Sequence, residues 1–164
     1  MDAKEIPVYE ALDALQISYE RFSHPAAMTM QDCDVFDHGR GAAHCKNLFL
    51  CNRQGTVFYL LMLVGDKAFR TKDISHQLGV SRLSFASAEQ LNEHLGLTPG
   101  AVTPMGLIHD HAGRVHVLLD RDIEQWDAVI VHPNVNTASI VLSNADFMKF
   151  LHSRPNELTL VDVA

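Results

Sequence analysis

The sequence lacks any apolar run long enough to cross a membrane as a helix. Such a helix needs about 20 consecutive apolar residues, whereas the longest apolar run, Val57–Val64, has the length of a β-strand. The opening stretch MDAKEIPVYE has neither the basic start nor the apolar core of a secretory signal, and neither end of the sequence carries a lipidation motif. We therefore expect a cytoplasmic protein that is neither inserted into membranes nor secreted.

Cysteine is scarce and follows no spacing pattern. The three cysteines, Cys33, Cys45 and Cys51, make an odd count and form no CxxC pair, which argues against a disulfide framework or a zinc ribbon. Reduced thiols in a cytosolic protein are the expectation. Cys45 or Cys51 would be a nucleophile only where its surroundings lower the thiol pKa, so buried and unreactive cysteines are the simpler interpretation.

Familiar catalytic signatures are also missing. The sequence has no GxSxG motif to support a Ser-His-Asp triad, and no HExxH motif of a zinc hydrolase. Its ten histidines leave one metal-dependent hydrolase hypothesis open, because His109, His111 and His116 lie close together in the sequence. The stretch 110–113 between them resembles a hairpin turn, however, and we expect no metal and no other cofactor.

The charge is negative but unevenly distributed. The net charge of −7 argues against a general nucleic-acid binder and against DNA as a partner. Between residues 38 and 87, however, seven basic residues accompany two acidic ones, so this stretch carries +5 and the rest of the chain −12. A basic face on an acidic body suits a polyanionic ligand held at one place. A solvated surface of uneven charge is an equally good interpretation.

The pattern of apolar residues predicts one domain of mixed α/β (α+β) architecture. A chain of 164 residues with 47% hydrophobic composition fits a single core. Helices and strands do not alternate strictly, and short turns join neighbouring strands, so the sheet should be mixed rather than parallel. The expected helices are 6–17, 29–37, 71–78, 88–95 and 144–152, and the expected strands are 18–22, 47–51, 56–64, 83–86, 115–119, 128–131, 137–142 and 158–163.

Three places in the sequence could carry chemistry. Lys46 opens an apolar strand, where a cation can be aimed into a cleft. The second place is a loop of Gly100, Ala101, Val102, Thr103 and Pro104. Its glycine permits close approach of a ligand and its proline fixes the far end, so its backbone N–H groups can face a carbonyl oxygen. His132 ends a strand and could act as an acid, a base or a positioning group. Each feature alone also suits an ordinary surface residue or turn.

Five segments, taken in order, carry a family resemblance. They are CKNLFLCN (Cys45–Asn52), LVGDKAFRTKDISHQLG (Leu63–Gly79), LSFAS (Leu83–Ser87), GLTPGAVTPMGL (Gly96–Leu107) and VHPN (Val131–Asn134). Together they resemble the YbaK/ProX family of aminoacyl-tRNA deacylases, over the chain from the first helix to about residue 151. The pair Lys46-Asn47 before Leu-Phe-Leu is similar to the ProX branch, which is linked to alanine wrongly attached to proline tRNA.

The resemblance implies a single editing domain over residues 1–164. Its fold would be a partly closed, barrel-like mixed sheet of about seven strands surrounded by helices. Its activity would be hydrolysis of an aminoacyl ester without a metal or a covalent intermediate, in which the terminal ribose hydroxyl of the tRNA helps to activate water. In the family, the lysine matching Lys46 is the central site residue, and the loop matching Gly100–Pro104 binds the aminoacyl group through its backbone. The positions matching Asn47 and His132 line the same pocket.

This activity is consistent with the chemistry of the residues. An aminoacyl ester is already reactive, so a positioned water and a stabilised oxyanion suffice, and each well-placed donor contributes roughly 3–4 kcal/mol. Lys46 could anchor the terminal phosphate or ribose, or polarise the carbonyl; the sequence leaves both roles open. The size of the editing pocket would decide which amino acid is removed. A second pocket is needed because a synthetase discriminates against an amino acid that lacks one methylene by only about 1–3 kcal/mol. Met30, Phe49 and Val102 are the candidate walls of a second, smaller pocket.

The expected partner is mischarged tRNA, recognised at its acceptor end. Arg70, Lys72 and Arg82 are candidates for contacts with the acceptor-stem backbone. Since the sequence shows no separate anticodon-binding module, tRNA identity would depend on the acceptor end or on a partner such as prolyl-tRNA synthetase. The alternative function is a non-catalytic module that uses the same pocket to sense a tRNA or an amino acid.

Overall fold

The computed structural model describes residues 2–25, 43–65 and 67–163, and within them the strands pair in one continuous series. Seven of the eight described strands follow the order β1-β7-β6-β2-β3-β5-β8, and the eighth, β4, pairs with β2 off this path. Three of the pairs, β2 with β6, β3 with β5, and β5 with β8, are parallel, so the predicted mixed sheet is confirmed. The strands are β1 (Glu20–Ser23), β2 (Ala43–Cys51), β3 (Phe58–Val64), β4 (Ser84–Phe85), β5 (Val115–Asp120), β6 (Ala128–Val131), β7 (Ala138–Ser143) and β8 (Leu158–Val161).

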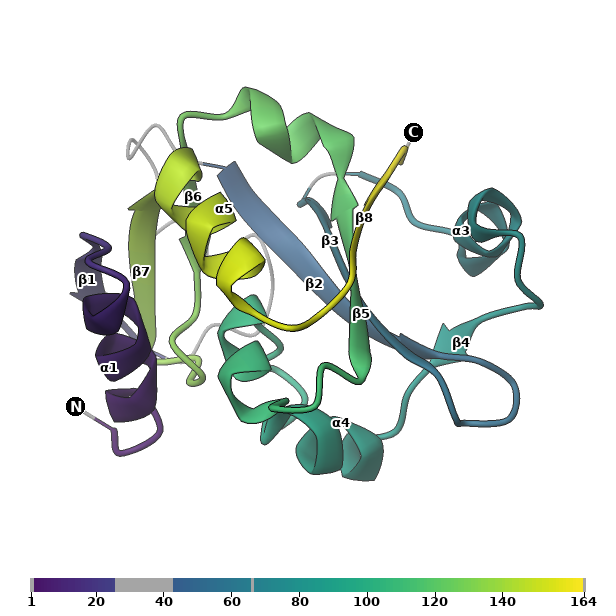
Figure 1. The fold of residues 1–164 in the computed structure, drawn as a ribbon, viewed down its shortest axis with the longest axis horizontal. Helices are drawn as coiled ribbons and strands as arrows, with labels where there is room; N and C mark the ends of the chain where they lie inside the picture. The colour runs from purple at the N-terminus through teal and green to yellow at the C-terminus, as the bar shows by residue number, and fades with distance from the viewer. Residues whose placement is uncertain (1, 26–42, 66, 164) are drawn as a thin grey trace.

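The hairpin of β2 and β3 lies at the centre of the molecule (Figure 1). The two strands pair antiparallel from Cys45 opposite Val64 to Cys51 opposite Phe58. The Asn52 side-chain oxygen closes the turn by accepting the backbone N–H of the two residues before β3, at 2.8 and 3.1 Å. Gly55 supplies the positive φ of +67° that the turn requires. The hairpin predicted from the sequence is therefore confirmed.

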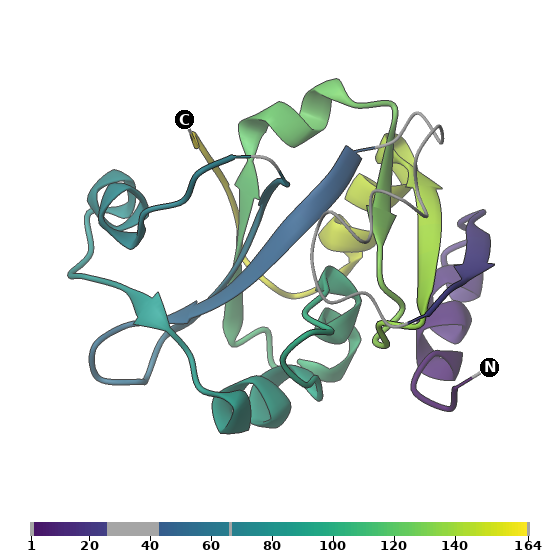
Figure 2. The ribbon, with the colours of Figure 1, turned by 180° about the vertical axis from the view of Figure 1, so that it is seen from behind.

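Alternation of side chains along β2 divides the interior into two hydrophobic clusters. Cys45, Phe49 and Cys51 belong to the larger cluster, together with side chains of α1 (Ile6–Ala14), α4 (Ala88–Leu95) and α5 (Asn144–Ser153). Leu48 and Leu50 belong to the smaller cluster, which includes Ile74 of α3 (Thr71–Leu78). Figure 2 shows, from behind, that α3 is set apart from α1, α4 and α5. Opposite faces of one strand thus serve two different cores.

The helix predicted at 88–95 is confirmed as α4, and a capping box begins it. The Ser87 hydroxyl accepts the backbone N–H of Gln90 at 3.1 Å, and the Gln90 side chain accepts the backbone N–H of Ser87 at 2.8 Å. Gly96 ends the helix with a φ of +67°. Among the residues described, no helix combines the length and the apolar character needed to cross a bilayer.

Four local predictions differ from the structure. β2 begins at Ala43, so Lys46 lies within the strand and does not open it, because its pairing with β6 extends the strand before the predicted start. α1 ends at Ala14 instead of continuing to residue 17, since the chain turns through Gln16 at a φ of +59°. Part of the stretch expected as a loop forms the 3₁₀ helix η1 (Pro104–His109), and a second 3₁₀ helix, η2 (Arg121–Gln125), follows β5. The turn at 110–113 joins η1 to β5 and is therefore not a hairpin turn. The helix expected at 29–37 lies outside the described residues.

A buried ion pair ties α1 to β1. The Glu5 carboxylate, whose side chain is 1% exposed, accepts hydrogen bonds from the Tyr9 hydroxyl at 2.7 Å and from Arg21 Nε at 2.8 Å. Burial acts to raise the pKa of Glu5, but the hydrogen bonds from Arg21 and Tyr9 outweigh it and hold the pKa below its usual 4.5. The charged form of Glu5 therefore stabilises the folded state.

Arg21→Ala is expected to lower the free energy of unfolding by about 3 kcal/mol at pH 7, because it leaves a buried carboxylate without its cation. A carboxyl with a lowered pKa stabilises the fold above its unfolded-state pKa, and this contribution is lost as the pH falls through the folded-state value. The difference in the free energy of unfolding between variant and wild type, measured with urea, should therefore be smaller at pH 3 than at pH 7. An equal difference at both pH values would contradict the assignment. As a control, Arg121→Ala breaks an exposed pair with Asp162 and should cost about 0.5 kcal/mol or less.

Candidate active site

A small pocket of about 190 Å³ lies where β2 and β4 meet the start of α4 and the loop after it. Only two of its lining residues, Asn47 and Ser87, have polar side chains, and none is charged. A pocket of this size and character suits a small, largely apolar group. Its lining consists of Asn47, Leu48, Phe49, Phe85, Ala86, Ser87, Ala88, Leu91, Pro99, Gly100 and Val102.

Four residues predicted from the sequence meet in this pocket. Asn47 and Phe49 come from β2, and Gly100 and Val102 come from the loop after α4. Sequence reasoning missed the third side, which is formed by residues 85–88 and Leu91. The capping box at Ser87 located the start of α4, but only the pairing of β4 with β2 brings that helix end beside Asn47. Met30, the remaining predicted wall, lies outside the described residues.

Aromatic packing makes the Phe49 wall rigid. Its side chain is buried and stacks on Phe58, with the ring centroids 5.6 Å apart. The imidazole of His94 lies 4.0 Å from the Phe58 ring, measured between centroids. Burial is the main cause that lowers the pKa of His94, so this ring is neutral at pH 7. The pocket wall therefore consists of packed, uncharged rings with little freedom to shift.

Two hydrogen bonds of the Thr103 hydroxyl anchor the loop of residues 100–104. The Thr103 side chain is fully buried, donates a 2.6 Å hydrogen bond to the backbone carbonyl of His132, and accepts the backbone N–H of Met105 at 3.3 Å. Gly100 has a φ of +92°, a conformation that residues with a Cβ rarely adopt. Ala101 is buried, and Pro104 begins η1. The loop thus keeps a fixed backbone course beside the pocket.

Thr103→Val is expected to lower kcat for ester hydrolysis about tenfold while KM changes little, because the loop loses its bond to the strand end at His132 but keeps its packing. Thr103→Ser, which retains the hydroxyl, should restore most of the rate. Single-turnover deacylation measures the loss directly. A valine variant with wild-type kcat would show that the bond serves stability alone, which thermal unfolding of the same samples would reveal.

His132 lies behind this loop and is not among the residues that line the pocket. Its Nδ1 is 3.0 Å from the Ala138 carbonyl, which can only accept, so Nδ1 donates and Nε2 of the neutral ring remains an acceptor. The His24 ring stands nearby, 6.2 Å between centroids. The structure therefore connects the His132 backbone to the loop through Thr103 and fixes the orientation of the His132 ring, which it does not place among the residues that line the pocket.

Lys46 and Asn47 are neighbours in β2 and so project to opposite sides of the strand. Asn47 shares the face of Phe49 and lines the pocket, whereas Lys46 shares the face of Leu48 and Leu50, which pack toward the α3 side. The Lys46 side chain is half-buried and forms no hydrogen bond or ion pair with any described residue. Its ammonium group is therefore a cation without a partner among the described residues, and Lys46 is not one of the residues that line the pocket.

The side-chain oxygen of Asn47 is buried and has no hydrogen-bond partner among the residues that the structure describes. An unsatisfied buried acceptor costs about 1–3 kcal/mol. A ligand that brings an N–H or O–H donor into the pocket would recover this cost. Among the described residues that line the pocket, Asn47 is the one with a buried side-chain acceptor that lacks a partner.

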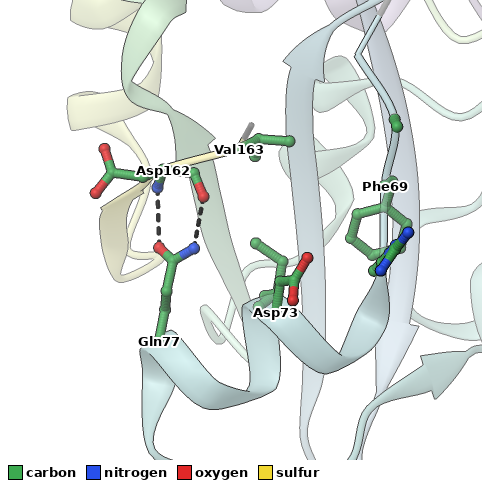
Figure 3. A pocket seen from close by; sticks show the side chains of 8 residues that line it. Phe69, Asp73, Gln77, Asp162 and Val163 are labelled. Atoms are coloured by element: carbon green, nitrogen blue, oxygen red, sulfur yellow. Dashed lines mark hydrogen bonds between the residues drawn. The ribbon is translucent and has the colours of Figure 1, made fainter.

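The three predicted tRNA-binding residues fall on two sides of α3. Lys72 and Arg82 line a groove of about 510 Å³ together with His76, and no acidic residue is part of that lining. Arg70 instead lines a pocket of about 430 Å³ with two aspartates, Asp73 and Asp162 (Figure 3). In this second pocket the Gln77 side chain bonds both backbone groups of Asp162 and so fastens the C-terminal segment to α3.

The remaining candidates from the sequence do not form a second site. Burial, with a smaller contribution from Asp120, raises the pKa of the Cys45 thiol to about 12, so it is not a thiolate at pH 7. Cys51 is buried as well. His116 pairs with Glu157 at 3.1 Å. Within the described part of the chain, no three His, Cys, Asp or Glu side chains are arranged to hold a metal, so His109, His111 and His116 are not brought together.

Comparison with known proteins identifies the fold and the class. Residues 24–150 match the model of the aminoacyl-tRNA editing domain. The chain is 34% identical over 163 residues to the prolyl-tRNA editing protein ProX of Acetoanaerobium sticklandii, covering 99% of both chains. It is 32% identical to prolyl-tRNA synthetase associated domain-containing protein 1 of Bos taurus, covering 87% of this chain and 85% of that one. A crystal structure described as a candidate trans-editing enzyme for prolyl-tRNA synthetase superposes with a TM-score of 0.78 at 17% identity, covering 99% and 98% of the two chains.

These matches, together with the mixed sheet and its small uncharged pocket, define an aminoacyl-tRNA deacylase. The chain belongs to the aminoacyl-tRNA editing domain family.

Proposed function

We propose that this chain is a cytoplasmic, free-standing editing enzyme that removes alanine from proline tRNA, and that residues 1–164 act as one editing domain. Its substrate is the acceptor end of mischarged tRNA, and prolyl-tRNA synthetase is the partner whose errors it corrects. Support for the tRNA and the synthetase comes from the names of the relatives. The observation that carries the proposal is the 190 Å³ pocket, uncharged and small, with an unpaired acceptor on Asn47.

We expect the pocket to accept alanine, the smaller of the two amino acids, and to exclude proline. Phe49 and Val102 narrow it, and the aromatic packing behind Phe49 resists widening. A synthetase site built for proline rejects alanine weakly, because missing methylenes cost only about 1–3 kcal/mol. A second site that admits alanine and excludes proline by overlap would supply the missing discrimination. The Asn47 oxygen would accept a hydrogen bond from the α-ammonium group of the bound alanine.

The chemistry requires only water and positioned donors. Water attacks the ester carbon, the bond from that carbon to the ribose oxygen breaks, and a proton passes to the ribose oxygen, which leaves free alanine and uncharged tRNA. Backbone N–H groups of the loop 100–104 would stabilise the oxyanion. Lys46, on the α3 side of β2, would hold the terminal phosphate or ribose. Neither a metal nor a covalent intermediate is part of this route.

Deacylation of proline tRNA charged with alanine, cysteine or serine tests the proposal. The expected result is rapid loss of alanine, slower loss of serine and cysteine, and stable prolyl-tRNA. Activity should persist after exhaustive chelation. No turnover of any charged tRNA, combined with measurable binding of uncharged tRNA, would instead support the non-catalytic binding module.

A further inference from the structure

Phe85 is a large apolar side chain exposed at the rim of the candidate pocket. It is 61% exposed and lines the pocket from β4, whose other residue, Ser84, is also exposed. Pairing with Leu50 of β2 fixes its backbone, and the backbone N–H of Ala86 donates to the Phe49 carbonyl at 3.0 Å. The fold therefore holds the position of Phe85 firmly without using its ring to build the core.

A second aromatic ring supports Phe85. Phe69, from the segment before α3, meets it edge to face, with ring centroids 6.1 Å apart and ring planes at 70°. Phe69 itself is half-buried and packs on the smaller hydrophobic cluster. Such a pair limits the rotation of the exposed ring and leaves most of its surface to solvent. An ordered, exposed aromatic ring is the arrangement that base stacking requires.

The chain leads directly from a basic groove to this ring and on into the pocket. Arg82 lines the groove that also contains Lys72 and His76, and Phe85 follows it by three residues, about 10 Å along an extended segment. Residues 86–88 then line the pocket. No acidic side chain belongs to the lining of the groove or of the pocket. Cations, a stacking ring and the reaction pocket thus follow one another in the order in which a single strand would meet them.

The geometry points to Phe85 as a stacking platform for an unpaired base at the 3′ end of the tRNA, with the basic groove holding phosphates of the same strand. This inference rests on the proposed function, because it places the charged end of an RNA at the pocket. A cationic groove beside an exposed aromatic ring is the combination by which proteins hold single-stranded nucleic acid without reading its sequence. Phe85 is then a substrate-binding residue outside the amino-acid pocket.

The test uses an uncharged RNA stem with an unpaired 3′ end that carries 2-aminopurine as its last base. Its fluorescence is quenched when the base stacks on an aromatic ring. Wild-type protein should quench it on binding. Phe85→Leu, which keeps an apolar residue in β4, should abolish the quenching and weaken binding about 5- to 100-fold. Phe85→Trp should retain both. Trp126→Leu is the matched control, since Trp126 is 41% exposed but follows η2, far from β4 in both views (Figures 1 and 2).

Because the RNA carries no amino acid, this result is separate from deacylation. Quenching by a wild-type protein that deacylates nothing would sustain the platform and overturn the proposed function. If the wild type deacylates its substrate, but Phe85→Leu binds and quenches the RNA as well as the wild type does, then the stacking role of Phe85 is wrong and the proposed function stands. Weaker binding of Phe85→Leu without quenching in the wild type would also overturn it, since the ring would then act without stacking. Unchanged thermal unfolding of Phe85→Leu confirms that the variant is folded.

Discussion

Lys46→Ala is expected to lower kcat/KM for deacylation of Ala-tRNA(Pro) about 100-fold, which corresponds to about 2.7 kcal/mol of transition-state stabilisation. The physical reason is the loss of a cation that no described residue neutralises and that is carried by the strand whose next residue, Asn47, lines the pocket. Since Lys46 projects to the face opposite Asn47, most of the loss should appear in KM, as for a group that anchors the phosphate or ribose. Steady-state kinetics on charged tRNA, with kcat and KM determined separately, tests this prediction.

Two controls make the Lys46 result specific. Lys4→Ala removes an exposed lysine near the N-terminus that lines none of the three pockets and should leave both parameters unchanged. Raising the salt concentration should weaken the wild type more than Lys46→Ala, because the variant has one phosphate contact fewer to screen. A variant that loses kcat at unchanged KM would instead assign Lys46 to polarisation of the carbonyl. Lys46→Arg should recover only part of the activity, since the planar guanidinium does not replace a compact ammonium.

Asn47→Leu is expected to make the protein more stable and less active. Leucine removes a buried acceptor that has no partner in the free protein, so unfolding should cost about 1 kcal/mol more than in the wild type. The same change removes the proposed acceptor for the α-ammonium group, so kcat/KM should fall about 30-fold, or about 2 kcal/mol. Urea unfolding and deacylation of Ala-tRNA(Pro), measured on one preparation, test the expected gain in stability and the expected loss of activity together.

A substrate change provides the matching control for Asn47. Acetylation of the alanine amino group abolishes its positive charge and two of its donors, so N-acetyl-alanyl-tRNA should be a poor substrate for the wild type. Asn47→Leu should discriminate little between the acetylated and free forms. If the wild type hydrolyses both equally well, Asn47 does not bind the amino group. A variant that loses both stability and activity would show that the unpaired oxygen has a structural role instead.

Local signals in the sequence were sufficient for most of the secondary structure. The turn around Asn52 and Gly55, the capping box at Ser87 and the stop at Gly96 each act within a few residues, so they could be read without a structure. The two 3₁₀ helices were missed because each is begun by a side-chain cap, at Thr103 and at Asp120, in segments without apolar periodicity.

Some features of the candidate site could likewise be predicted from the sequence, and others could not. The sequence by itself determined the hairpin, the polar Asn47 in an apolar strand and the rigid loop beginning at Gly100, because composition and turn chemistry are local properties. Only the tertiary structure decided that β4 brings Phe85 beside that pocket, that Thr103 bonds the strand end at His132, and which face of β2 meets the pocket. Such contacts join residues far apart in the chain, and their geometry follows from how the strands pair and pack, which no local pattern specifies.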